Sequence, residues 1–243
     1  MKSEFPITDH EEVQWMKEVY KLIQKGNNQC KQLDLLEVYA YPNSNLTDTA
    51  IACGLRAKRF TREDGDLSTT SGRVKLLTEI LLFRPKHVWL APDCKPWSAW
   101  NRFNAQRSVS GFHRVCQEQE NSQVHIKLCN LIAKIQLAED RHIHIENPWT
   151  SGLWKQRALE EFLQVSLPAR LDQCMLGLKH PNSQDPMEKK TRVQTSSRTM
   201  WETLDNRICD HTHQHAHIAR GNHKGHVDRK STRLNSSHVS ESR

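Results

Sequence analysis

The sequence lacks the features that mark membrane, secreted and repeat proteins. No apolar run reaches the roughly eighteen residues of a membrane-spanning helix, and the opening MKSEFPITDHEE contains no apolar segment of the kind that secretory signals have. No internal repeat is present. The 7 cysteines are odd in number and irregularly spaced, which argues against a disulfide framework and for a reducing, intracellular compartment, either nucleus or cytoplasm.

The composition suits one large domain, or one domain with attachments. Of the 243 residues, 36% are hydrophobic and 26% are charged, so the chain can bury a core and is not expected to be disordered throughout. The formal net charge is +7, which permits a polyanionic partner without identifying one.

The C-terminal tail is set apart from the domain. Residues 221–243 are expected to be disordered, and residues 228–243 have no hydrophobic period and resemble the translation of a sequencing adapter. The alternative is a natural disordered tail. Residues 228–243 hold four basic and two acidic residues, so the net charge of +7 becomes +5 without them. The argument from charge for a nucleic-acid partner weakens accordingly.

Hydrophobic periodicity predicts helices and strands in alternation. In the N-terminal segment 1–32, a capping box at Thr8-x-x-Glu11 precedes a helix over residues 13–23. Strands are predicted at 35–40, 56–61, 87–91 and 142–145, and further helices at 46–53, 74–82, 122–137 and 153–163. This alternation predicts an α/β, Rossmann-like domain over residues 33–220 whose mostly parallel sheet is flanked by helices.

Two loops at the expected working edge of this sheet carry distinctive motifs. Ligands of such sheets bind beyond the carboxyl ends of the strands. The loop after Ala91 reads Pro92-Asp93-Cys94-Lys95-Pro96-Trp97-Ser98, and the loop after Ile145 reads Glu146-Asn147-Pro148. They resemble the cytosine-C5 DNA methyltransferase family, in which one strand is followed by Pro-Cys-x-Pro-Phe-Ser and a later strand by Glu-Asn-Val. The resemblance covers roughly residues 33–200 and implies a methyltransferase fold.

The resemblance also implies a chemistry. Cys94 is the implied nucleophile, because a thiolate that adds to C6 of cytosine prepares C5 to take a methyl group from S-adenosylmethionine. Glu146 is the implied acid beside N3, and Asn147 is implied to hold its loop. The substrate would be a cytosine flipped out of DNA. The short stretch between Pro148 and Asn182 leaves no room for a separate target-recognition domain.

The chain departs from the family's pattern around the nucleophile and in a later motif. Asp93 replaces the proline that the family has before its cysteine, and a carboxylate beside a thiol disfavours the thiolate. Lys95 is expected to act in the opposite direction. Gln194-Thr-Ser-Ser-Arg198 keeps the two ends of a Gln-x-Arg-x-Arg segment, so Arg198 is a candidate base contact, the alternative being a phosphate contact or plain surface charge.

The methyl-donor site follows the family only in part. The residues implied to contact S-adenosylmethionine are Glu37, Ala40, Asn43, Asp66 and Pro92. The first loop holds Tyr41-Pro42-Asn43-Ser44 where the family has glycines, and of these Asn can adopt the left-handed conformation but Tyr cannot do so cheaply. Asp66 is equally well interpreted as a turn-forming aspartate, and Glu37 as a charge near a strand end.

Cysteines and histidines gather near the end of the chain. Cys209-x-His211-x-His213 would place three ligands on one face if the segment were a strand, and Cys174 would complete a closed zinc site. The alternative is a solvated histidine-rich segment.

Different classes of function therefore remain open. The first is a methyltransferase that acts on DNA, and the second is a catalytically degenerate DNA-binding module of the same fold, for instance one carried by a mobile element. Asp93 and the first loop favour the second. Residues 100–107 mix aromatic, amide and cationic groups that suit base stacking and phosphate contact, or form an ordinary solvated loop. A third hypothesis is a Rossmann-like domain for some other small ligand.

Overall fold

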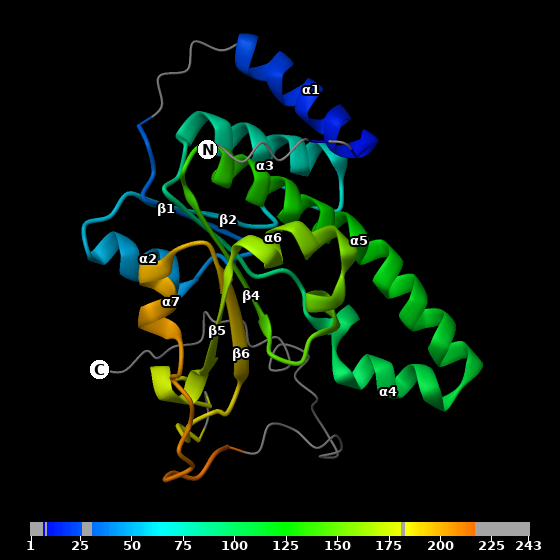
Figure 1. Cartoon of the computed structure of the whole chain (residues 1–243), viewed down its shortest axis with the longest axis vertical. Coiled ribbons are helices and arrows are strands. Elements are labelled where there is room, and N and C mark those ends of the chain that lie inside the picture. The colour runs from blue at the N-terminus through cyan, green and yellow to red at the C-terminus, as the bar shows by residue number, and fades with distance from the viewer. Residues whose placement is uncertain (1–6, 8, 26–30, 181–182, 217–243) are drawn as a thin grey trace.

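A computed structural model describes residues 7, 9–25, 31–180 and 183–216 (Figure 1). The expected disorder of residues 221–243 and the capping residue Thr8 lie outside the described residues. The N-terminal helix is capped within them by Asp9, whose Oδ1 accepts hydrogen bonds from the backbone N–H groups of Glu11 and Glu12 at 2.9 and 3.3 Å. A carboxylate at this position satisfies the free N–H groups of the first turn.

One mixed sheet of six strands forms the centre of the described chain, in the order β2-β1-β3-β4-β6-β5. Its strands are β1 (Leu35–Val38), β2 (Ala57–Phe60), β3 (His87–Leu90), β4 (His142–Pro148), β5 (Leu167–Asp172) and β6 (Lys190–Thr195). The first four run parallel, and β6 is antiparallel to both β4 and β5. The predicted α/β fold with a mostly parallel sheet is confirmed, while β5 and β6 were not predicted.

Helices precede, connect and follow these strands (Figure 1). They are α1 (His10–Lys25), α2 (Asn45–Ala52), α3 (Thr70–Phe83), α4 (Ala99–Arg107), α5 (Val109–Ala138), α6 (Glu160–Val165) and α7 (Arg198–Leu204). Short 3-10 helices are η1 (Lys95–Trp97), η2 (Gly152–Lys155), η3 (Arg157–Leu159) and η4 (Gln173–Leu176). The loop alternative for residues 100–107 was wrong, because these residues form α4. In the described ranges, no helix combines the length and apolarity that crossing a bilayer requires.

The strands present an apolar face and a mixed face, because successive side chains point to opposite sides of the sheet. Leu36, Val88 and Ile143 lie in register on the first face, which α3, α5 and α6 cover to form the main core, with α1 packed outside α3 (Figure 1). Trp89 and His144 lie in register on the second face, which α7 covers beside β5 and β6. The second face carries buried polar side chains that an apolar core would exclude, among them His144 and Glu146, so it is the face that can carry chemistry.

Candidate functional site

The two motifs meet at the carboxyl edge of the sheet. Strands β3 and β4 are neighbours and pair in register. The loop expected after Ile145 was wrong, because Glu146, Asn147 and Pro148 pair with β6 and form the end of β4, beside the loop that follows β3. Asn147 is buried, and its Nδ2 donates a 2.9 Å hydrogen bond to the carbonyl oxygen of Pro92. This bond joins the Glu-Asn motif directly to the loop that carries Cys94.

Cys94 occupies the N-cap position of η1 and is partly buried. Burial, followed by the negative charge of Asp93, raises the pKa of its thiol, while Lys189 lowers it and Glu146 raises it further. The expected effect of Asp93 is therefore present. The prediction that Lys95 lowers the pKa of Cys94 was wrong. Lys95 forms a 3.2 Å ion pair with Glu118, and the nearby positive charge comes from Lys189 instead.

Glu146 is buried on the second face of the sheet and held by two donors. Its Oε1 accepts hydrogen bonds from Gln173 Nε2 at 3.1 Å and from Lys189 Nζ at 3.0 Å. Gln173 is itself fixed by a 3.1 Å bond from the same nitrogen to Thr191 Oγ1. Among the described residues, Oε2 of Glu146 makes no hydrogen bond, so one carboxylate oxygen remains available to a ligand.

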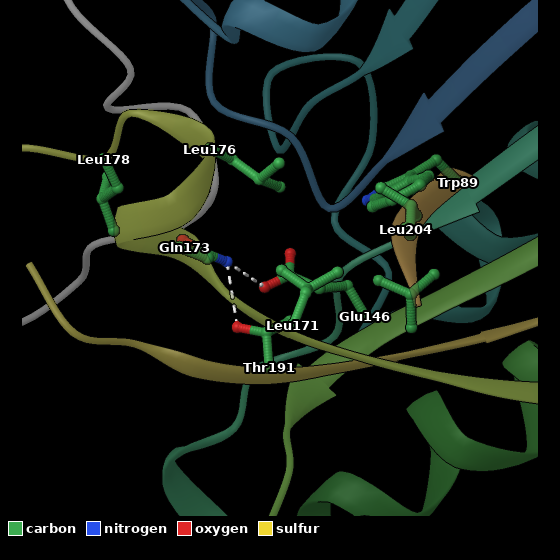
Figure 2. A pocket seen from close by; sticks show the side chains of 9 residues that line it. Trp89, Glu146, Leu171, Gln173, Leu176, Leu178, Thr191 and Leu204 are labelled. Carbon is green, nitrogen blue, oxygen red and sulfur yellow. Dashed lines mark hydrogen bonds between the residues drawn. The ribbon is translucent and has the colours of Figure 1, made fainter. Parts of the chain in front are cut away.

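A cavity of about 100 Å³ lies against Glu146. Figure 2 shows its carboxylate between Leu176 of η4 on one side and Trp89 and Leu204 on the other. The indole Nε1 of Trp89 is buried and has no hydrogen-bond partner in the described part of the chain. Cys94 does not line this cavity. Glu146 thus faces an apolar hollow with few polar groups, and Cys94 lies in the loop beyond it.

Glu37 has a structural task that sequence reasoning missed. Its carboxylate is buried and accepts hydrogen bonds from Ser44 Oγ at 2.5 and 2.6 Å, from Thr47 Oγ1 at 2.7 Å and from the Thr47 backbone N–H at 3.2 Å. It therefore caps the first turn of α2, which the side chain of the N-cap residue Ser44 does not do. Oε2 accepts three of these bonds and Oε1 shares the Ser44 hydroxyl, so the carboxylate serves α2 in this structure, and its contact to S-adenosylmethionine stays a prediction.

The left-handed residue of the first loop is Tyr39, with φ of 63°, and not Asn43. An aromatic residue adopts this conformation at a cost of order 1–3 kcal/mol, so the surrounding structure must hold it. The Tyr39 hydroxyl lies 3.3 Å from Nδ1 of His125 on α5. Ala40 is half-buried and Asn43 is exposed. The loop thus turns without glycine. The turn occurs at Tyr39, directly after β1, and not at Asn43 in the middle of the loop.

Asp66 and Pro92, the other residues implied to contact S-adenosylmethionine, also form hydrogen bonds within the protein. Asp66 Oδ1 accepts bonds from the backbone N–H and hydroxyl of Ser68 at 2.9 and 2.7 Å, and Oδ2 pairs with Arg62 at 3.2 Å. These hydrogen bonds lower the pKa of Asp66 and are the contacts of a turn-forming aspartate. Pro92 is buried, and its carbonyl oxygen takes the bond from Asn147.

Arg198 is placed on α7, away from the contacts that surround Cys94 and Glu146. It is exposed, forms a 2.8 Å ion pair with Glu202, and its guanidinium lies over the ring of Trp201. Gln194, the other end of that motif, is buried in β6 and donates to Ser166 Oγ at 2.7 Å. Gln194 is therefore held inside the sheet, whereas Arg198 lies at the surface and its contact to a base stays a prediction.

The structure brings the cysteine and histidine cluster together, but with His215 in place of the expected His211. Ligand atoms of Cys174, Cys209, His213 and His215 all lie within 4.8 Å of one another. His211 falls outside this quartet because the segment is not a strand, and His211 itself has a φ of 58°, so alternate residues do not share a face. His215 continues the alternating histidine pattern, which was the available sequence signal. Gln173 and Lys189 had no such signal, because long-range pairing brings them to Glu146.

Comparison of the chain with models of known protein families and with curated proteins found no match. A function therefore has to be argued from the residues at the carboxyl edge and from the resemblance that their motifs carry.

Proposed function

We propose that this chain is a cytosine-C5 methyltransferase-like protein that takes a flipped-out cytosine of DNA between the loop after β3 and the C-terminal end of β4. Cys94 would be the nucleophile, Glu146 the group beside N3, and S-adenosylmethionine the methyl donor. The observation that supports this is the 2.9 Å bond from Asn147, near the end of β4, to Pro92 in the loop after β3, which joins the two motifs. It makes Cys94 and Glu146 parts of one structure although 51 residues of sequence separate them.

The base side of the proposed site has a workable chemistry. The Cys94 thiolate would form a bond to C6, and the electron pair of the C5=C6 double bond would make C5 nucleophilic. Glu146 in its protonated form would give its proton toward N3, and Lys189, whose Nζ lies 3.0 Å from Glu146 Oε1, would stabilise the carboxylate left behind. Once C5 carried the methyl group, loss of the C5 proton would expel the Cys94 thiolate and restore the double bond. Cys94 has to lose its proton first, and burial with Asp93 raises its pKa, so addition should accelerate as the pH rises.

The residues implied to bind S-adenosylmethionine, together with helix α4, support a second candidate function: a nucleic-acid-binding module without catalysis. The Glu37 carboxylate caps α2, so S-adenosylmethionine would lack the contact to Glu37 that the resemblance implies. Helix α4, directly after the Cys94 loop, exposes Trp100 and Phe103 by 75% and 51%, and the guanidinium of Arg107 lies over the Phe103 ring. Exposed rings beside cations are the groups on which single-stranded bases stack.

One experiment separates the two candidates. The full chain is incubated with a DNA oligonucleotide that contains 5-fluorocytosine, with and without S-adenosylmethionine, and the products are separated under denaturing conditions. The methyltransferase proposal predicts a covalent adduct that requires the donor and disappears in Cys94→Ala but persists in Cys116→Ser, an exposed cysteine of α5. Absence of the adduct over a pH range from 7 to 9.5 would reject catalysis.

The binding module makes a different prediction. Affinity for single-stranded DNA should survive Cys94→Ala, weaken with salt, and fall about tenfold in Trp100→Ala. Tyr20→Ala is the matched control, since Tyr20 is also exposed, by 54%, but lies on α1. An affinity for single-stranded DNA that is unchanged in Trp100→Ala, or no measurable affinity at low salt, would contradict the binding-module proposal.

A further inference from the structure

Two thiols and two imidazoles converge beside the sheet, outside the site proposed for the base. Cys209 Sγ lies 3.6 Å from Nε2 of His213 and 3.4 Å from Nε2 of His215. Zinc–sulfur bonds of about 2.3 Å and zinc–nitrogen bonds of about 2.05 Å, at tetrahedral angles, separate sulfur from nitrogen by about 3.6 Å. Both distances therefore agree with ligands around one shared ion, and Cys174 completes a set of four within 4.8 Å.

Backbone contacts hold these ligands in place independently of any ion. Cys174 lies in η4, directly after β5. The chain returns beside it because Asp172 bonds twice to the later segment: its N–H donates to the Arg207 carbonyl at 2.8 Å, and its Oδ2 accepts from the Cys209 N–H at 2.9 Å. Farther along, the N–H of Ala216 donates to the carbonyl of Pro186 at 2.8 Å. The ligand loop is thus anchored at both ends.

The donor set and its surroundings suit zinc. Two cysteines with two histidines are one of the usual ligand sets of closed structural zinc sites. The Cys209 sulfur also accepts a 3.3 Å bond from the backbone N–H of His211, which helps to fix its position. Outside the quartet, the carboxylate of Glu188 lies within 4.8 Å of ring nitrogens of His211 and His215, the kind of partner that orients a ligating histidine.

We propose that Cys174, Cys209, His213 and His215 bind one zinc ion in a closed structural site that fastens the segment after α7 to η4. The site also reaches Glu146, because Gln173, the neighbour of Cys174, donates to Glu146 Oε1 at 3.1 Å. Zinc would then fix η4 and keep Gln173 in place. Zinc binding itself does not depend on the function proposed for Cys94.

The test measures metal on the full chain, purified with a thiol reductant and zinc and then dialysed. We expect one zinc per chain by plasma mass spectrometry, lost in Cys209→Ser and in His215→Gln. Cys116→Ser, an exposed thiol, and His211→Gln, a histidine outside the quartet, should retain it. A chelator should lower the midpoint of thermal unfolding of the native chain by at least about 5 °C, because metal that binds only the folded chain stabilises it.

Substitution of cobalt for zinc identifies the ligands without relying on variants that may not fold. Tetrahedral cobalt with thiolate ligands absorbs in the visible range and shows a sulfur-to-metal charge-transfer band in the near ultraviolet. We expect both in the native chain, which separates this site from the histidines beyond residue 216. Cobalt spectra without the thiolate band, zinc retained by Cys209→Ser, or a zinc-free chain with a Cys174–Cys209 disulfide would each overturn the proposal.

Discussion

Glu37 offers a sharp test, because the two roles assigned to it predict different measurements. As the cap of α2, its buried carboxylate satisfies three donors from Ser44 and Thr47. As a contact to a methyl donor, it would contribute to binding and little to folding. Glu37→Ala removes the acceptor entirely, whereas Glu37→Gln keeps one oxygen that can take the bonds now made by Oε2.

The size of the expected effect follows from these contacts. A hydrogen bond to a charged group contributes about 1.5–3 kcal/mol, and a buried donor that loses its partner costs about 1–3 kcal/mol. Glu37→Ala leaves three such donors without a carboxylate, so we expect the free energy of unfolding to fall by about 3–5 kcal/mol. That is a large part of the 5–15 kcal/mol typical of a domain. Glu37→Gln, which loses the charge and one acceptor oxygen but keeps the bonds made by Oε2, should cost about 1–2 kcal/mol.

Urea unfolding followed by tryptophan fluorescence measures these differences, provided that the slope of free energy against urea is unchanged. Glu63→Ala, at an exposed acidic residue after β2, is the control and should change the free energy by no more than about 0.5 kcal/mol. A loss below about 1 kcal/mol in Glu37→Ala would refute the capping argument. If Glu37→Gln lost S-adenosylmethionine binding but kept full stability, Glu37 would be a contact to the cofactor and not chiefly a cap of α2.

Two further predictions concern titration. Asp93→Asn removes a charge that raises the pKa of Cys94, so alkylation of this thiol by iodoacetamide at pH 8 should accelerate roughly two- to fivefold, and an unchanged rate would contradict that coupling. Burial, followed by two neighbouring histidines, lowers the pKa of His144 from 6.5 to about 3, so the folded chain keeps this ring neutral while the unfolded chain protonates it. Its stabilising contribution is complete above pH 6.5 and is lost as the pH falls from 6.5 toward 3, at up to about 1.4 kcal/mol per pH unit. His144→Gln should flatten the dependence of the unfolding free energy on pH between 4 and 6, and equal slopes would reject this account.

Local patterns were sufficient for the first four strands and for the edge at which the motif loops meet. β1 and β3 are short, mostly apolar runs between turn residues, whereas β2 includes Lys58 and Arg59, and the alternation with helices indicates the parallel direction. The same logic placed Cys94 and Glu146 at one end of the sheet. What failed locally was α4, because exposed Trp100 and Phe103 on a mostly polar helix give no amphipathic period.

The contacts that define the site could not be predicted from the sequence, since they depend on pairing between distant segments. Strand β6 reaches β4 only because β5 and β6 form an antiparallel pair that inserts beside the parallel strands. That pairing brings Lys189 and Gln173 to Glu146. Likewise, the capping role of Glu37 had no local signal, because its hydrogen-bond donors, Ser44 and Thr47, lie in the following turn and helix, and their hydroxyls could equally have faced water.

The unit made of β5, η4, β6 and the segment to residue 216 therefore determines what Glu146 can do. Lys189 and Gln173 both belong to it, and they supply the two hydrogen bonds that orient the carboxylate. The zinc ligands belong to the same unit, and Cys174 is adjacent to Gln173 in sequence. Removing the metal should thus disturb the Glu146 side of the site before it disturbs the Cys94 loop, which is held from the other direction by Asn147. We expect the chelated chain to unfold at a lower temperature, and an unchanged unfolding temperature would contradict this arrangement.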